Sequence, residues 1–277
     1  MLNTDYKDKV VVVTGAGGVL CSLMVKEFGK AGAKVAALGL HYDKVKKIED
    51  ELKDEGLICK AYECNVVDEE SLKKVRDEIN RDFGTCDILI NGAGGNNPMA
   101  TTDNEFAIEA KEGQKTFFDL SSEGIDKVFT LNFQGTLLPC QIFGKDMMDK
   151  RKGTILNISS MNSFIPLTKI PAYSGAKAAI SNFTQWLATY FAGTGIRVNA
   201  IAPGFIVTSQ NYNLLYNLDG TPTARSEKIL NSTPEHRFVK AEELLGAVLF
   251  LCDDISASAI TGVVLPIDCG FSAYSGV

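Results

Sequence analysis

A tyrosine and a lysine lie four residues apart in the segment Tyr173-Ser174-Gly175-Ala176-Lys177. On a helix, positions i and i+4 share one face, so the phenol and the ammonium group can point into the same crevice. An ammonium group ~4 Å away would contribute ~4 kcal/mol at an effective dielectric of ~20, and would lower the pKa of the phenol from about 10 toward ~7. A phenol with such a pKa suits general acid–base catalysis.

Two further polar residues could complete a site of this kind. Ser160 follows the strand-like run Thr154–Ser159 and precedes the tyrosine by thirteen residues. Its hydroxyl would face the carboxyl edge of a sheet and could hydrogen-bond the substrate oxygen that Tyr173 protonates. Asn132 lies in an otherwise apolar helical segment, where a polar side chain needs a partner. It could hold a water that links Lys177 to solvent as a proton relay.

Two glycine-rich segments could bind a nucleotide. Thr14-Gly15-Ala16-Gly17-Gly18-Val19-Leu20-Cys21 lies between an apolar, β-branched run and a helical pattern. Glycines let the backbone turn tightly and approach a pyrophosphate, and the free N–H groups at a helix N-terminus favour an anion. Asn91-Gly92-Ala93-Gly94 follows the fourth predicted strand. Each segment alone could be an ordinary turn, but both would meet beyond the carboxyl ends of the strands, where open α/β sheets bind ligands.

Short apolar runs alternate with helical patterns along the chain, and these elements would position the site. The alternation predicts βαβ units, and hence an α/β fold with a single Rossmann-type, doubly wound parallel sheet and helices on both faces. Helices are expected near Cys21–Ala31 and Tyr42–Glu55. The predicted strands are Lys9–Thr14, Lys34–Leu38, Ile58–Cys64, Ile88–Asn91, Thr154–Ser159, Arg197–Ile201 and Val263–Ile267.

No low-complexity linker, charge block or internal repeat divides the sequence, so residues 1–277 are expected to form one dinucleotide-binding and catalytic domain. Two long polar segments, near 94–120 and 205–236, interrupt the alternation of strands and helices. Loops of this length tend to be functional, and we expect insertions that border a substrate. Decorative surface insertions are the alternative interpretation.

The composition argues against several classes of function. The formal net charge of −6 argues against a protein that binds a nucleic-acid backbone, which would normally carry a basic face. No run approaches ~20 apolar residues, and the N-terminus lacks the pattern of a secretory signal. We therefore expect a cytoplasmic protein with neither a membrane nor a nucleic acid as partner. Seven cysteines without a CxxC pair, and only two histidines, predict buried, reduced thiols and no metal site.

Taken together, these motifs resemble the short-chain dehydrogenase/reductase family along nearly the whole chain. The resemblance rests on the Thr14-Gly15 loop, Asn91-Gly92-Ala93-Gly94, Asn132, Ser160, Tyr173-xxx-Lys177 and Pro203-Gly204, in this order and spacing. It implies a Rossmann-type fold, an NAD or NADP cofactor, and a catalytic set of Asn132, Ser160, Tyr173 and Lys177. It also implies a homotetramer or a homodimer.

The chain departs from the family pattern around the cofactor. Val19 and Cys21 stand where the family has glycines, and Gly39 stands where NAD-preferring members usually carry an aspartate. Lys44 could attract a 2′-phosphate, but an unclamped NAD would fit as well, so NAD versus NADP stays open. The residues expected to bind the cofactor are Gly15, Gly17, Gly18, Val19, Leu20, Gly39, Asn65, Val66, Asn91, Gly92, Ala93, Tyr173, Lys177, Pro203, Gly204 and Thr208.

A closer resemblance concerns the substrate. The segments 91–96, 100–105, 116–120 and 270–277 look like the D-mannonate oxidoreductase (fructuronate reductase) group of this family. That resemblance implies reduction of D-fructuronate, a keto sugar acid of hexuronate metabolism, to D-mannonate. A sugar acid needs a cation for its carboxylate and donors for its hydroxyls. We expect Asn96, Asn162, Gln210 and Asn211 to bind it; Asn97, Lys169, Arg225 and Arg237 also come from the bordering segments.

Other functions remain open at this point. The substrate could be another polyol, sugar or keto acid, such as gluconate. The altered glycine loop and Gly39 would also suit a non-catalytic nucleotide-binding sensor. An isomerase or dehydratase could use the same Tyr173 and Lys177 pair, although those relatives usually carry a longer C-terminal substrate domain.

Overall fold

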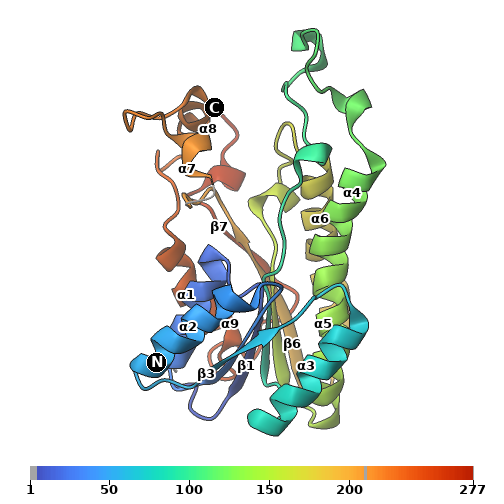
Figure 1. Ribbon diagram of the computed structural model, residues 1–277, viewed down its shortest axis with the longest axis vertical. Coiled ribbons are helices and arrows are strands. Elements are labelled where there is room, and N and C mark those ends of the chain that lie inside the picture. Colours follow the sequence, from blue (N-terminus) through green and yellow to red (C-terminus); the bar gives the residue numbers. More distant parts are fainter. Residues whose placement is uncertain (1–4, 209–210, 277) are drawn as a thin grey trace.

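The central layer of the molecule is a seven-stranded sheet in the order β3-β2-β1-β4-β5-β6-β7 (Figure 1). All neighbouring strands pair in parallel. The computed structural model describes residues 5–208 and 211–276. The predicted α/β fold with a parallel sheet is confirmed, and every predicted strand is found within two residues of its expected bounds. The strands are β1 (Val10–Thr14), β2 (Lys34–Gly39), β3 (Cys59–Glu63), β4 (Ile88–Asn91), β5 (Gly153–Ile158), β6 (Ile196–Pro203) and β7 (Val264–Ile267).

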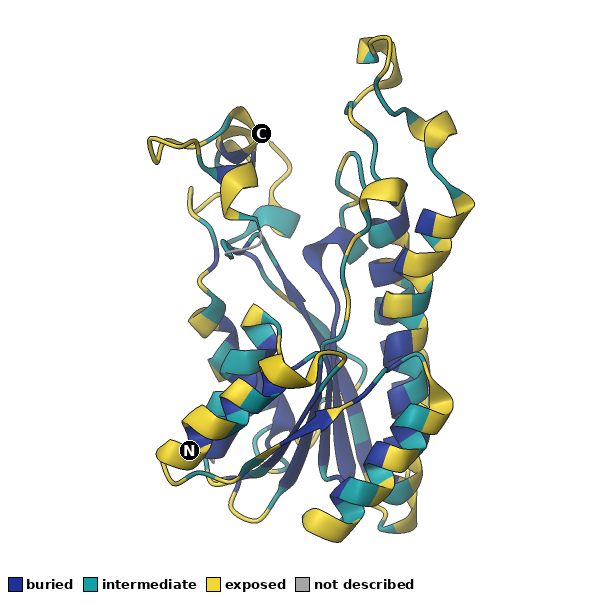
Figure 2. Ribbon diagram, in the orientation of Figure 1, coloured by how far each residue is buried: buried dark blue, intermediate teal, exposed yellow. Residues whose placement is uncertain are grey.

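Both faces of the sheet are buried, because the strands carry apolar side chains on both sides. In β1, Val11 and Val13 belong to one hydrophobic cluster, whereas Val10 and Val12 belong to the other. Successive side chains of a strand point to opposite faces, so an unbroken valine run fits a strand covered on both sides. The strands accordingly form the buried centre of the molecule (Figure 2).

Helices cover the sheet on both faces (Figure 1). On one face lie α1 (Val19–Lys30), α2 (Tyr42–Asp54) and α9 (Leu245–Cys252). On the other lie α3 (Glu69–Asp82), α5 (Gly135–Asp149) and α6 (Pro171–Tyr190). A further helix, α4 (Ser122–Phe129), continues through a π-helical turn at Thr130–Gln134 into α5.

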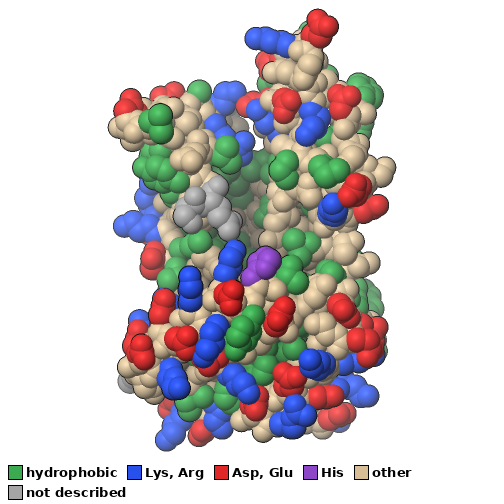
Figure 3. Space-filling view, in the orientation of Figure 1, with side chains coloured by type: hydrophobic (Ala, Val, Ile, Leu, Met, Phe, Trp, Pro, Cys, Tyr) green, Lys and Arg blue, Asp and Glu red, His purple; other side chains and the backbone are tan. Residues whose placement is uncertain are grey.

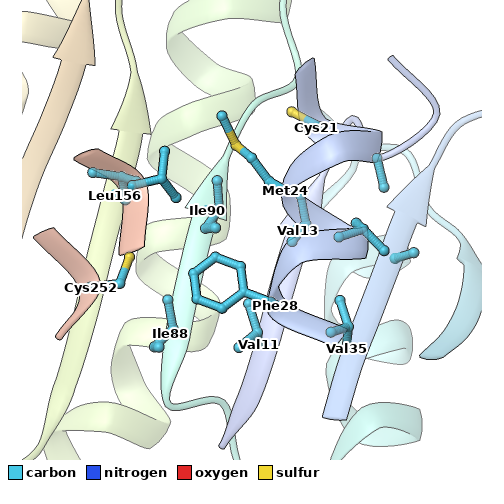
Figure 4. Packing of buried hydrophobic residues seen from close by; sticks show 14 of the residues in the cluster. Val11, Val13, Cys21, Met24, Phe28, Val35, Ile88, Ile90, Leu156 and Cys252 are labelled. Carbon is cyan, nitrogen blue, oxygen red and sulfur yellow. The ribbon is translucent and has the colours of Figure 1, made fainter. Parts of the chain in front are cut away.

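The packing of α1 shows how the first face is closed. Phe28 and Met24 point from the helix toward β1 and β4, where they meet the side chains of Val11 and Ile88, among others (Figure 4). Neither Phe28 nor Met24 exposes more than 1% of its surface. After the helix, Gly32 adopts a φ of +88°, which favours glycine and ends the helix where the sequence predicted a stop.

The strand order reverses between β1 and β4, and this point positions the site. The chain moves outward from β1 to β2 and β3, then returns to β4 on the other side of β1. Thr14 and Asn91 are paired at the carboxyl ends of β1 and β4. The two glycine-rich segments that follow these residues therefore start side by side, at the place where doubly wound sheets bind ligands.

Two segments rise beyond the carboxyl ends of the strands (Figure 1). We call residues 94–120 the arm; it contains the 3₁₀ turns Pro98–Ala100, Ala107–Glu109 and Phe117–Asp119. We call residues 205–236 the lobe; it contains α7 (Tyr212–Leu215) and α8 (Ala224–Asn231). The surface is hollowed between them (Figure 3). Both segments coincide with the interruptions expected from the sequence.

Within the described ranges, no helix is long and apolar enough to cross a membrane. The same residues contain no group of three or more His, Cys, Asp and Glu side chains that could hold a metal ion. Strands from Val10 to Ile267 share one sheet, which supports the expected single domain; the domain boundaries themselves stay a prediction.

Candidate active site

Helix α6 brings Tyr173 and Lys177 together at the carboxyl edge of β5. Pro171 occupies the first turn of the helix, where its missing N–H costs nothing. One turn further on, Nζ of Lys177 lies 5.6 Å from the centre of the Tyr173 ring. This nitrogen also donates a hydrogen bond of 2.8 Å to the carbonyl oxygen of Ile158, the last residue of β5. Only 5% of Lys177 is exposed, so a cation stands inside the protein at the expected place.

The hydroxyl of Ser160 lies next to this pair. Ser160 follows β5 and caps the 3₁₀ turn Met161–Ser163, where its Oγ accepts a hydrogen bond from the Asn162 backbone. The same hydroxyl hydrogen-bonds the phenol of Tyr173. A carbonyl oxygen that approaches Tyr173 would therefore meet two hydroxyl groups at once.

Asn132 occupies the π-helical turn between α4 and α5. Its Nδ2 donates to the carbonyl oxygens of Gly95 at 2.7 Å and Val128 at 2.8 Å, and its Oδ1 accepts from the Gly95 backbone at 3.2 Å. We expected this side chain to hold a relay water, but both amide protons are already used on the backbone. In the structure, Asn132 instead connects the π-helical turn to the start of the arm through its hydrogen bonds to Gly95.

These groups converge on Gly94. A Cβ atom at this position would lie 2.6 Å from Oδ1 of Asn132 and 3.4 Å from Nζ of Lys177. The first distance is shorter than real Cβ contacts allow, so a side chain at residue 94 would displace the amide. The glycine therefore lets three segments distant in the sequence meet at one point.

Burial governs the protonation of the two catalytic candidates. It lowers the pKa of Lys177 to about 8, because the protein interior disfavours the ammonium form. Burial also raises the pKa of Tyr173, and the hydrogen bond from Ser160 only partly opposes this effect. The lowering toward ~7 expected from the lysine alone is thus wrong for the protein without its cofactor, because burial is the largest influence on the pKa of Tyr173.

A cavity of about 360 Å³ opens beyond β1, β2 and β4. Gly15, with a φ of +64°, turns the chain so tightly that an added Cβ would lie 2.8 Å from the backbone of Ala93. The Thr14 hydroxyl stabilises the same contact by accepting hydrogen bonds from the backbone N–H groups of Gly92 and Ala93. The cavity is lined by Gly15, Gly17, Gly18, Gly39, Leu40, His41, Lys44, Val45, Cys64, Asn65, Val66, Gly92, Ala93, Gly94 and Leu131.

This cavity fits the adenosine half of a dinucleotide. Bare glycine backbone at its floor leaves room for a phosphate chain, and the N-terminus of α1 supplies free N–H groups beside it. At its rim, a Cβ on Gly39 would lie 2.8 Å from Cγ1 of Val45, so a carboxylate at residue 39 would need the valine to move. His41 and Lys44 line the rim instead. Val45, Leu131 and Cys64 were not predicted, since apolar residues carry no nucleotide signal in sequence.

The other residues expected at the cofactor do not line this cavity. Val19 lines a neighbouring cavity of about 710 Å³ together with Val207, and Leu20 packs against the core. Pro203 ends β6. A Cβ on Gly204 would lie 2.6 Å from Cα of Asp268, so this glycine permits close packing beside β7. The Thr208 backbone donates to Oδ1 of Asn211.

Cys21, which replaces a family glycine, fills the space under the second glycine segment. A Cβ added to Gly92 would overlap its sulfur atom. Burial raises the pKa of the Cys21 thiol to about 12, although Lys177 acts in the opposite direction. The thiol is therefore neutral packing material at physiological pH. All seven cysteines are free, and five of them are buried.

The substrate candidates differ in what their side chains already do. Asn96 donates to the hydroxyl of Thr101 at 2.9 Å. Asn211 holds its own loop, because its amide also donates to the carbonyl of Ile206. Asn162 is buried and its amide oxygen has no partner in the described part of the chain. Gln210 lies outside the described residues.

A buried chain of polar side chains beneath the site was missed by sequence reasoning. Nδ2 of Asn91 donates to Oδ1 of Asn157 at 2.9 Å, and Nδ2 of Asn157 donates to Oγ1 of Thr184 at 2.9 Å. All three residues are at most 1% exposed. They join β4, β5 and α6 below the reacting groups. The asparagine inside the apolar run of β5 was the available signal.

Comparison with known proteins identifies the class to which this site belongs. Residues 9–217 match the short chain dehydrogenase family. A crystal structure of a Haemophilus influenza protein, provisionally named D-Mannonate oxidoreductase and with bound NAD, gives a TM-score of 0.96 at 57% identity, covering 99% of this chain and 98% of that chain. A Bacillus subtilis (strain 168) protein named "Uncharacterized oxidoreductase UxuB" is 48% identical over 276 residues, or 100% of this chain and 99% of that protein. An "NAD-dependent glycerol dehydrogenase" from Listeria innocua is 34% identical over 268 residues, or 97% of this chain and 95% of that protein.

The fold and the site thus define a nicotinamide-dependent oxidoreductase. The chain belongs to the short-chain dehydrogenase family, whose members use NAD(P) and act on CH–OH groups of small molecules. The predicted family, enzyme class and cofactor class are confirmed. A purely nucleotide-sensing protein is thereby set aside.

Proposed function

We propose that the protein interconverts a keto sugar acid and its hydroxy acid, with D-fructuronate and D-mannonate as the pair. The observation that carries this proposal is the full-length similarity to the Haemophilus influenza protein provisionally named for that reaction. A site that holds two hydroxyl groups and a buried cation suits a carbonyl that becomes an alcohol.

In this proposal Tyr173 transfers the proton. During reduction its phenol donates a proton to the carbonyl oxygen, and during oxidation its phenolate removes that proton. Ser160 hydrogen-bonds the same oxygen and holds it beside the phenol. The nicotinamide, when bound, supplies or accepts the hydride at the adjacent carbon.

Lys177 and Asn132 support Tyr173 without contacting the substrate. The ammonium group of Lys177 stabilises the phenolate through its charge, and the Ile158 carbonyl fixes the position of that group. Asn132 holds the backbone of Gly95, and so keeps the start of the arm against the π-helical turn.

The arm and the lobe are proposed to border the sugar acid. They are linked across the hollow by an ion pair of 3.1 Å between Glu105 and Lys228. Lys169 anchors the arm by donating to the carbonyl oxygen of Asp103 at 2.9 Å. Arg225, exposed on α8, is an available cation for a substrate carboxylate.

We also propose that the chain forms a homodimer or homotetramer through the outer face of α5 and α6. Phe183, Trp186 and Tyr190 stack along α6, with ring centroids 6.3 and 5.1 Å apart. Trp186 and Tyr190 remain 57% and 67% exposed. Aromatic rings are enriched at protein interfaces, so a second copy of the chain suits this face. A cytoplasmic location stays a prediction.

The test is a panel of hexuronates and hexonates, assayed with both cofactors through the absorbance of the reduced nicotinamide. The proposal expects the largest kcat/KM for D-fructuronate reduction or D-mannonate oxidation. A larger value for a different sugar acid, such as gluconate, would reject the assigned pair but keep the substrate class.

The similarity to the Listeria innocua glycerol dehydrogenase favours a second candidate, an uncharged polyol. Glycerol and four- to six-carbon polyols therefore belong in the same panel. Activity on these alcohols that exceeds the activity on every acid would move the function to this class.

A further inference from the structure

The side-chain amide of Asn162 is buried without a partner. Only 4% of the residue is exposed, and within the described part of the chain its Oδ1 atom is enclosed but accepts no hydrogen bond. An unpaired buried amide oxygen is unfavourable, because it has lost its hydration and gained nothing in return. Such an atom in a native structure calls for an explanation.

The backbone of Asn162 is held by Ser160. The backbone N–H of Asn162 donates to Oγ of Ser160 at 3.3 Å. Two groups of Ser163, its backbone N–H and its hydroxyl, bond the carbonyl oxygen of Ser160 at 2.9 and 2.8 Å. The 3₁₀ turn is therefore held at both ends, and Asn162 stays two residues beyond the serine that is proposed to hydrogen-bond the reacting oxygen.

The chemistry of the missing partner follows from the atom that lacks it. An amide oxygen only accepts hydrogen bonds, so a carboxylate, a ketone or a phosphate oxygen cannot satisfy it. A substrate hydroxyl can. Since the backbone of Asn162 is bonded to Ser160, we expect that hydroxyl on a carbon close to the one that reacts.

We propose that Asn162 is a specificity-determining residue, which accepts a hydrogen bond from a substrate hydroxyl on the carbon next to the reacting carbonyl. The residue then selects hydroxy ketones over ketones that lack this group. The inference rests on the proposed reaction at Ser160 and Tyr173, but it requires neither a carboxylate on the substrate nor a particular sugar.

The chain offers a matched control in Asn80. Its Oδ1 atom is also buried and unpaired, yet it lies near the C-terminal end of α3, while its Nδ2 donates to Asp146. α3 ends where the chain turns toward the start of β4, which is the opposite edge of the sheet from Ser160. Loss of the Asn80 amide should therefore leave substrate choice unchanged.

The experiment uses two ketone pairs that differ in one hydroxyl. The uncharged pair is hydroxyacetone and butanone. The acidic pair is D-fructuronate and its analogue without the terminal hydroxyl next to the keto group. We expect the wild type to prefer the hydroxylated member by about ten- to a hundredfold in kcat/KM, because the deoxy member leaves the amide unpaired. Asn162→Ala should bring this ratio close to one, mainly by slowing the hydroxylated member.

Melting temperature and fluorescence titration of the reduced cofactor show whether each variant is folded. Asn162→Leu, which is close in size to asparagine, replaces Asn162→Ala if the latter does not fold. Asn80→Ala should keep the wild-type ratio. A ratio that survives in the Asn162 variants, or an equal loss for both members of a pair, overturns the inference, as does a wild type that prefers neither hydroxylated ketone.

The two proposals fail separately. If D-fructuronate is not turned over but the uncharged pair behaves as expected, the sugar-acid function is wrong and the role of Asn162 stands. If D-fructuronate is the best substrate and Asn162→Ala keeps the wild-type ratio, the reverse holds.

Discussion

The ammonium group of Lys177 faces the ring of Tyr173 from 5.6 Å, one helical turn away. Within the described residues, the pKa of Lys177 responds to its burial and to the Cys21 thiol, and no carboxylate contributes. No carboxylate of these residues therefore neutralises this ammonium group, and its charge can act on the phenol of Tyr173. Several measurable properties of the enzyme depend on this arrangement.

Tyr173→Phe should lower kcat by about 100- to 10,000-fold, because the variant keeps the ring but loses the group that transfers the proton. The phenol makes no contact that the core depends on, so the melting temperature should change little. Loss of reduced-nicotinamide absorbance with a saturating keto acid measures the effect. An unchanged rate would remove Tyr173 from the mechanism.

The pH dependence should differ between the two directions. Burial raises the pKa of Tyr173, so the phenol is protonated at neutral pH. Reduction needs this protonated form, and its kcat/KM should stay flat near neutrality and fall at alkaline pH. Oxidation needs the phenolate and should become faster as the pH rises. Profiles measured in both directions from about pH 6 to about pH 10 test this expectation, and parallel profiles would contradict it.

Lys177→Met should remove a pH-dependent part of the stability. Burial lowers the pKa of Lys177 to about 8, while the unfolded chain binds the same proton up to about 10.4. Between these values the unfolded state holds more protons, so the wild type gains stability as the pH rises, by up to about 3 kcal/mol. Below pH 8 Lys177 is protonated in both the folded and the unfolded protein, so the free-energy cost of burying its charge does not change with pH.

Urea unfolding of the wild type and Lys177→Met across this pH range isolates the contribution, because all other groups titrate in both proteins. The free energy of unfolding of the wild type should rise relative to that of Lys177→Met as the pH rises. Lys53→Met, at an exposed position of α2, is the control for the loss of a lysine outside the site. A constant difference for Lys177→Met would show that the lysine is hydrated.

Lys44→Ala should weaken the binding of NADP(H) more than the binding of NAD(H). Lys44 lines the rim of the adenosine cavity, where Gly39 provides no carboxylate. Only the cofactor with a 2′-phosphate can pair with this ammonium group, and loss of such a charge-assisted bond should raise its Kd by about tenfold. Fluorescence titration with both reduced cofactors measures the ratio. Equal weakening would mean that Lys44 contacts something common to both.

Trp186→Glu should dissociate the assembly proposed for α5 and α6. A charge buried between two copies is costly, whereas the 57% exposed tryptophan costs little to replace in a single copy. Light scattering after size-exclusion chromatography compares each protein with the 30.0 kDa chain mass. Ile58→Glu, at a 50% exposed position just before β3, is the control. A wild type that elutes as a monomer would reject the proposed interface.

The sequence allowed the sheet and the reacting groups to be predicted, because both depend on local patterns. The valines of β1 mark a strand buried on both faces, and the spacing of Tyr173 and Lys177 fixes a shared helix face. The π-helical turn at Asn132 was not predictable, since it depends on hydrogen bonds to Gly95, distant in the sequence. The pKa of Tyr173 was predicted wrongly because burial cannot be read from a spacing of four residues.

The buried amide chain from Asn91 through Asn157 to Thr184 ties together the elements that carry Tyr173, Lys177 and Ser160, whereas the arm and the lobe reach one another through a surface ion pair. In the proposed function, the groups for proton transfer and Asn162 therefore belong to the shared frame of β5 and α6, whereas the arm and the lobe can vary without disturbing that frame. Mutations in these two outer segments are then expected to change which alcohol is accepted while the acid–base chemistry is retained.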